Sequence, residues 1–214
     1  GNQQHRMNGF ALGLDNWIYA ANGDSGGMIT SKVTGKRVNI NGLDFRFKVT
    51  GEFEAVAGQT QFGRWRDDWG NWFGNNNPNW VWHYHVPIRY FARNPHLATP
   101  GMRRNVFSNN RLFPVSPRME RPNTPGAYGR VTSACSAQPY RGGLFGKDFA
   151  SSVFISEPVH NLVHREVLIP EGISFRGQRA KDEADREFLA STDNWFRPTQ
   201  IKTGPDGALY IADM

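Results

Sequence analysis

The sequence GLDNWIYAA at residues 13–21 returns 191 positions later as GPDGALYIA at residues 204–212. The glycine, the aspartate, the tyrosine and the last alanine occupy the same places in both copies. A Gly-x-Asp turn followed by a strand with Leu or Ile and then Tyr is typical of the inner hairpin of a propeller blade, and this offset corresponds to about four blades of roughly 40 to 50 residues. The repeat therefore predicts part of a β-propeller.

The rest of the chain supports the same fold class. Short apolar runs bounded by Gly, Pro, Asn and Asp predict strands at 17–21, 44–49, 152–155 and 208–212. Only the segment QRAKDEADREFL (178–189) predicts a helix. We expect an all-β protein with about four blades of a six-bladed ring. One partial propeller domain would span residues 1–214, with an irregular Arg- and Pro-rich insertion at about 95–128.

Composition excludes several classes of protein. The chain is 38% hydrophobic and 13% aromatic, which is enough for a packed core, and no apolar run approaches the roughly 20 residues of a membrane-spanning helix. The single Cys135 excludes an internal disulfide and the paired cysteines of a c-type haem site, so any haem lies outside this chain. The net charge of +6 is concentrated at 89–130, where irregular sequence predicts a solvated insertion rather than a nucleic-acid surface. We expect the chain to be a piece of a longer protein.

His5 stands eight residues before Gly13, where the first copy of the repeat begins, a spacing written His-x7-Gly-x-Asp. This spacing resembles that of soluble quinoprotein glucose dehydrogenases and the related aldose and sorbosone dehydrogenases. The resemblance implies that His5 lies at the mouth of the central channel and takes the substrate's hydroxyl proton while a hydride passes to pyrroloquinoline quinone. Imidazole suits this role because it titrates near neutral pH. The alternative is a histidine near a chain end with no function.

The segment GRWRDDWG (63–70) resembles the family's Gly-x-Arg-Asn-x-x-Gly loop. The resemblance implies that Arg66 contacts the quinone and that Asp67 replaces the family's Asn. A carboxylate beside an anionic cofactor is unfavourable, and a Ca²⁺ ion ligated by Asp67 or Asp68 would offset the repulsion. The alternative is a structural ion-pair cluster formed by these side chains.

A third match runs through 141–145 and 152–165 and resembles a blade of the same family. It implies that Glu157, His160 and Asn161 face the channel after an inner strand. On this interpretation His160 is a second catalytic group, Asn161 contacts the cofactor and Glu157 contacts the substrate. A buried Glu/His pair suits acid–base chemistry, but structural pairs have the same composition.

The fourth match is the segment FRPT just before the second copy of the repeat, which resembles sorbosone-dehydrogenase-like proteins. It implies that Arg197 holds an anionic part of the cofactor, the alternative being a salt bridge to Asp193. Trp69, Trp72 and Trp195 would stack on a sugar ring, or else pack between blades.

The four matches occur in the family's order, and together they resemble the propeller of large bacterial membrane-bound dehydrogenases, in which helical repeats and a cytochrome c domain follow. The resemblance implies a sugar, polyol or aldehyde dehydrogenase that passes electrons to a cytochrome in the periplasm or another extracytoplasmic space. The alternative is a non-catalytic propeller that binds carbohydrate or protein. If the domain is an enzyme, we expect His5, Arg66, His160 and Arg197 to converge at one end of the channel.

Overall fold

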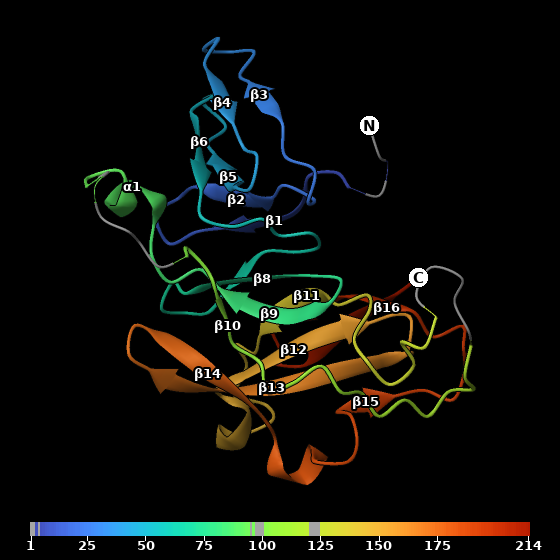
Figure 1. The fold of residues 1–214 in the computed structure, drawn as a ribbon. Coiled ribbons are helices and arrows are strands. Elements are labelled where there is room, and N and C mark those ends of the chain that lie inside the picture. Colours follow the sequence, from blue (N-terminus) through green and yellow to red (C-terminus); the bar gives the residue numbers. More distant parts are fainter. Residues whose placement is uncertain (1–2, 4, 95, 97–100, 120–124) are drawn as a thin grey trace.

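The computed structural model describes residues 1–214 apart from 1–2, 4, 95, 97–100 and 120–124. The protein is all-β, and its antiparallel sheets follow one another in chain order, from blue through green to red (Figure 1). The predicted all-β, propeller-like fragment is confirmed. None of the helices in the described ranges is long and apolar enough to span a membrane.

Three sheets have four main strands each. The first contains β1 (Asn8–Leu12), β2 (Ile18–Ala21), β5 (Asp44–Phe47) and β6 (Phe53–Val56), with a separate hairpin of β3 (Met28–Thr30) and β4 (Arg37–Asn39). The second contains β7 (Trp65–Arg66), β8 (Trp72–Asn76), β9 (Asn79–His83) and β10 (Arg104–Asn105), with a one-turn helix α1 (Ile88–Phe91) before β10. The third contains β11 (Cys135–Pro139), β12 (Ser152–Glu157), β13 (Leu162–Glu171) and β14 (Ser174–Arg179), and β15 (Leu189–Ala190) also pairs with β13. A last sheet pairs β16 (Pro198–Thr203) with β17 (Leu209–Asp213).

The two copies of the repeat form the same hairpin turn. In the first, the Asp15 carboxylate accepts hydrogen bonds from the Tyr19 hydroxyl at 3.0 Å and from the backbone amide two residues on at 3.3 Å. In the second, Asp206 accepts the corresponding bonds from Tyr210 and the backbone, both at 3.0 Å. Glycine is needed at Gly13 because a Cβ there would lie 2.6 Å from the Tyr19 ring. The repeat therefore reflects a shared hydrogen-bonded turn.

The first strands of the four sheets, β1, β7, β11 and β16, lie next to one another in that order and line one side of a channel. One hollow lies near their beginnings, with Gly9, Gly63, Ser136 and Thr199 in its lining. Another lies near their ends, with Leu12, Arg66, Gln138 and Lys202 in its lining. The strands therefore run in the same direction, and the channel has an N-terminal mouth, where they begin, and a C-terminal mouth, beside the hairpin turns.

The described part of the 95–128 insertion is less solvated than predicted. Its residues 104–105 form β10, the outer strand of the second sheet, and Val106 and Leu112 are buried in the core between the second and third sheets. The Val106 carbonyl lies so close to Gly177 of β14 that a Cβ on Gly177 would come within 2.1 Å of it. The apolar contacts of Val106 and Leu112 hold the insertion on the third sheet. Residues 95, 97–100 and 120–124 of the predicted insertion lie outside the described residues.

The helix predicted at 178–189 is wrong. β14 continues to Arg179, a 3₁₀ turn occupies Lys181–Glu183, and β15 begins at Leu189. Glu183 pairs with Arg165 and Glu187 pairs with His164, so these two acids face the sheet, whereas Asp182 and Asp185 are exposed. The charge pattern was therefore set by tertiary ion pairs and not by an exposed helix face.

Candidate functional site

The predicted site residues lie at two opposite mouths of the channel. The N-terminal mouth holds those that precede an inner strand or follow a second strand: His5, Glu157, His160, Asn161, Trp195 and Arg197. The other predicted residues belong to the β7–β8 hairpin on the C-terminal side: Arg66 lines the C-terminal mouth itself, and Asp67, Asp68 and Trp69 line a neighbouring cavity. Trp72, in the same hairpin, packs against Tyr19. The expected convergence of Arg66 with the histidines and Arg197 does not occur, because Arg66 ends an inner strand whereas the others stand at strand beginnings.

A carboxylate and an imidazole form a buried pair at the N-terminal mouth. Glu157, at the end of β12, is fully buried, and its Oε1 lies 2.9 Å from His160 Nδ1. The same carboxylate accepts hydrogen bonds from the Ser133 amide at 2.8 Å and the Thr132 hydroxyl at 3.2 Å. His160 is 5% exposed, and in the described chain its Nε2 has no hydrogen-bond partner. A carboxylate that accepts the Nδ1 proton leaves Nε2 with a lone pair, which is the tautomer of a general base.

Asn161 and Arg197 join two loops beside this pair. Asn161, with a φ of 58°, donates through Nδ2 to the Phe196 carbonyl at 2.7 Å. Arg197 donates from Nη1 to the Pro158 carbonyl at 2.9 Å. The predicted pairing of Arg197 with Asp193 does not occur; Asp193 instead accepts a hydrogen bond from the Trp195 amide. Both side chains thus fix the β12–β13 turn against the segment before β16.

His5 and Trp195 lie at the same mouth but are not joined to the pair. The His5 carbonyl accepts a hydrogen bond from the Ser25 hydroxyl at 2.6 Å, while no hydrogen bond between His5 and His160 exists in the part of the chain that is described. Trp195 is 84% exposed.

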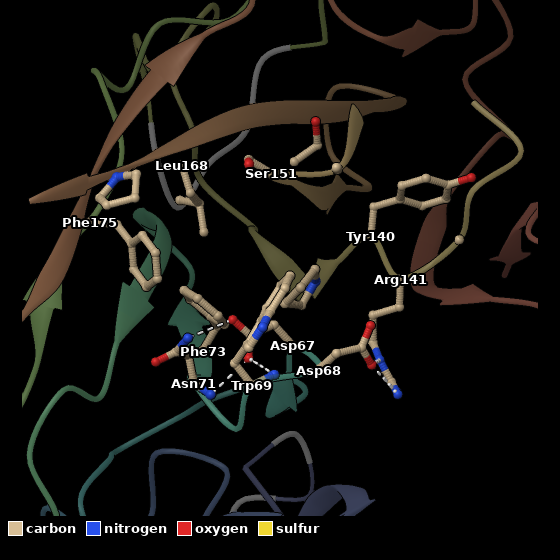
Figure 2. Close-up of a pocket in the computed structure, with 15 residues that line it drawn as sticks. Asp67, Asp68, Trp69, Asn71, Phe73, Tyr140, Arg141, Ser151, Leu168 and Phe175 are labelled. Atoms are coloured by element: carbon tan, nitrogen blue, oxygen red, sulfur yellow. Dashed lines mark hydrogen bonds and ion pairs between the residues drawn. The ribbon is translucent and has the colours of Figure 1, made fainter. Parts of the chain in front are cut away.

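Asp67 forms a hydrogen-bonded turn. Its Oδ1 accepts hydrogen bonds from the amides of Trp69 at 3.0 Å and Asn71 at 2.9 Å, and its Oδ2 accepts one from Asn71 Nδ2 at 2.7 Å (Figure 2). This is the geometry of Asp15 and Asp206. The shared pattern Asp-x-Trp, at 15–17 and 67–69, is the sequence signal that could have revealed the equivalence.

The neighbouring charges at this mouth are also engaged. Arg66 donates from Nε to the Leu12 carbonyl at 2.8 Å and from Nη1 to the Asp67 carbonyl at 2.9 Å. Asp68 pairs with Arg141 at 2.6 Å, as Figure 2 shows. The predicted ion-pair cluster of Arg66 with Asp67 and Asp68 is therefore replaced by a turn and by one ion pair across two sheets.

A cavity of about 400 Å³ lies between the second and third sheets next to these residues (Figure 2). Apolar side chains of Phe73, Leu168 and Phe175 form one part of its wall, and Trp69 lines it while remaining 79% exposed. Trp72, by contrast, stacks on Tyr19 with ring centroids 4.0 Å apart, between the first two sheets. Of the tryptophans predicted to stack on a sugar, Trp69 is free to do so at this cavity and Trp72 packs between blades.

Comparison with known proteins assigns the chain to one family. A family model described as Domain of unknown function (DUF7133) matches residues 1–214. The chain belongs to this family. No curated protein and no solved structure is significantly similar to the DUF7133 chain.

The quinone and Ca²⁺ that the resemblance implies do not fit the residues predicted for them in the DUF7133 domain. Arg66 and Arg197 lie at opposite mouths, so one cofactor cannot bridge them. Both oxygens of Asp67 accept hydrogen bonds from nitrogen donors, and Asp68 faces Arg141, so neither presents a free carboxylate to a cation. In the described ranges no group of three or more His, Cys, Asp or Glu side chains is arranged to hold a metal.

A second buried histidine in the domain serves the fold. His164 is fully buried between Glu187, at 2.7 Å from Nδ1, and Glu166, at 3.1 Å from Nε2. Burial opposes its charged form, but the two carboxylates outweigh burial and raise the pKa of His164. Glu166 also accepts hydrogen bonds from the amide and hydroxyl of Ser108, so this cluster anchors the insertion.

The residues that sequence analysis missed lie at the C-terminal mouth. Lys202, Gln138 and Arg141 surround a hollow there together with Arg66. Lys202 stands two residues before the Gly-x-Asp turn, so the sequence could have placed it at the end of an inner strand and thus at this mouth. No local sequence pattern indicates that Gln138, Arg141 and Arg66 lie near Lys202.

Proposed function

We propose that this domain is the substrate-oxidising propeller of a sugar, polyol or aldehyde dehydrogenase and that His160 is its proton acceptor. Oxidation of an alcohol to a carbonyl removes a proton from oxygen and a hydride from carbon. The proposal assigns the proton to His160 Nε2. The hydride goes to an oxidant of the quinone class, which is not assigned to residues of this chain because those predicted for it do not fit.

The observation that carries the proposal is the hydrogen bond of 2.9 Å between Glu157 and His160 Nδ1. A buried carboxylate that fixes the imidazole tautomer and leaves Nε2 unpaired is the arrangement of a general base. Arg197, held by the Pro158 carbonyl, places a guanidinium next to the same turn, where it can bind an oxygen of the substrate. The implied periplasmic location and electron transfer to a cytochrome belong to this proposal and are supported by the sequence resemblance alone.

The test is dye reduction by the intact protein with pyrroloquinoline quinone, Ca²⁺ and a panel of sugars, polyols and aldehydes. Loss of a general base lowers kcat by about 10²- to 10⁴-fold, so we expect such a drop for His160→Gln with little change in KM. His5→Gln is the matched control, because His5 lies at the same mouth without a carboxylate partner in the described chain. A drop in His5→Gln but not in His160→Gln would assign the base to His5, and no dye reduction by the unaltered protein would remove the enzyme proposal.

A second candidate function is carbohydrate binding without oxidation, and the exposed Trp69 beside its cavity favours it. An aromatic ring with free face area next to polar groups such as Asp68 and Arg141 suits a sugar ring. Trp69→Ala should then abolish retention on immobilised polysaccharides, whereas Trp195→Ala, which removes an equally exposed indole at the other mouth, should not. Equal retention of both variants would exclude this surface.

A further inference from the structure

The C-terminal mouth of the channel is a positively charged cavity outside the proposed catalytic pair. It has a volume of about 450 Å³ and is lined by the ends of β1, β7, β11 and β16 and the residues that follow them. Of the described residues that line it, Arg66, Arg141 and Lys202 are cationic and none is acidic. Asp68, which pairs with Arg141, is the nearest counter-charge and lines the neighbouring cavity instead.

Two of the three cations are not neutralised by the protein. Within the described ranges, no carboxylate pairs with Arg66 or Lys202. Lys202 remains solvent-exposed and lies over the face of the Trp65 ring. Partial burial of its ammonium group against this ring, together with the Arg141 guanidinium, lowers the pKa of Lys202 to about 8. A ligand anion would relieve this repulsion.

Gln138 adds a polar group that lacks a partner. Its side chain is 4% exposed and lines the same cavity. Its Nε2 donates to the Pro139 carbonyl at 2.8 Å, while its Oε1 is buried without a hydrogen bond in the described chain. Buried acceptors are nearly always paired, and this oxygen therefore has an unused capacity to accept a hydrogen bond.

We propose that the C-terminal mouth binds a small hydroxycarboxylate of the sugar-acid class. Lys202 and Arg66 bind the carboxylate through charge-assisted hydrogen bonds, and Gln138 Oε1 accepts a hydrogen bond from a hydroxyl. The apolar side chains of Phe10 and Leu12 and the Trp65 ring contact the carbon chain. The volume is ample for a six-carbon acid, since ligand cavities begin at about 300 Å³. The site lies at the opposite mouth from His160, so it is independent of the proposed catalytic pair.

The experiment is calorimetric titration of the intact protein with gluconate, glucose and inorganic phosphate. We expect gluconate to bind with a Kd of about 1 mM or tighter and glucose to bind at least tenfold more weakly, because it lacks the carboxylate. Lys202→Met and Gln138→Glu should each weaken gluconate binding by about tenfold or more, the first by removing a cation and the second by adding an anion. Lys36→Met removes one exposed positive charge in the β3–β4 hairpin and should leave binding unchanged.

Each other outcome overturns the assignment. Gluconate affinity that Lys202→Met and Gln138→Glu leave unaltered would place the ligand elsewhere. Phosphate that binds more tightly than gluconate would define a phosphate site instead, and glucose that binds equally well would show that the charge has no role. No saturable binding of gluconate below about 10 mM would exclude the site. His160→Gln should bind gluconate normally, so this result is separate from the fate of the dehydrogenase proposal.

Discussion

Asp44 is the buried charge on which the contact between the first two sheets depends. Its side chain has no exposed surface, and it accepts hydrogen bonds from the amides of Asn22 at 3.0 Å and Thr60 at 2.9 Å. Its second oxygen accepts the Thr60 hydroxyl at 2.6 Å and Arg64 Nη1 at 2.8 Å. Arg64 is itself buried and lies against the Tyr84 ring. We therefore expect Asp44→Ala to leave a buried guanidinium without its counter-charge, although Arg64 still donates to the Ala57 carbonyl, and to leave two buried amides without hydrogen-bond acceptors.

The expected cost follows from these contacts. Removing one partner of a buried ion pair destabilises a protein by about 3–5 kcal/mol, because the remaining charge is uncompensated. A chain of this size loses roughly 2–4 °C of melting temperature per kcal/mol, so Asp44→Ala should lower Tm by about 6–20 °C. Glu54→Ala is the control, because the Glu54 side chain is 43% exposed and Arg46 keeps its second ion pair, with Asp15, so the loss should be about 0–1 kcal/mol.

The assays are thermal unfolding, which gives Tm, and urea unfolding, which gives the free energy, both on the intact protein with tryptophan fluorescence; the urea midpoints are compared at constant slope. The double variant Asp44→Ala/Arg64→Met removes both charges, so it should cost less than the sum of the two single variants. A cost below about 1 kcal/mol for Asp44→Ala, or strict additivity in the double variant, would refute the view that an unpaired buried charge dominates.

Three further predictions concern stability. The carboxylates around His164 raise its pKa in the folded state. The stability that its charged form contributes is therefore fully present below the unfolded-state pKa of 6.5 and is lost as pH rises through the higher folded-state pKa. Glu187→Gln should flatten this decline of the urea midpoint with pH, and an unchanged pH dependence would contradict the cause given. Gly177→Ala should cost about 1–3 kcal/mol by forcing a Cβ against the insertion, while Gly143→Ala, which meets nothing within 4 Å, should be nearly neutral in the same assay. Asp67→Asn keeps the acceptor oxygen of the turn and should cost less than about 1 kcal/mol; a Ca²⁺-induced rise in Tm that this variant abolishes would restore Asp67 as a metal ligand.

The local hairpins could be predicted from sequence because their hydrogen bonds join residues two to four positions apart. Asp15 and Tyr19 therefore report the turn directly, and Asp206 and Tyr210 repeat it. Asp67 makes the same kind of local hydrogen bond, to amides two and four residues further on, but the family resemblance assigned it to a cofactor and the turn was not predicted.

The chain's own sequence determined the fold class, the inner hairpins and the presence of a Glu/His pair after a strand, although that strand, β12, is the second of its sheet and not the inner one that the sequence predicted. Tertiary structure alone decided which residues share a mouth of the channel, because that depends on the direction of strands separated by dozens of residues. It placed Arg66 with Lys202 and Gln138 rather than with His160. It also decided the structure of the charged segment at 178–189, which is not the predicted helix. Two of its glutamates pair with the buried His164 and Arg165, and these long-range ion pairs outweigh the weak local preference for helix.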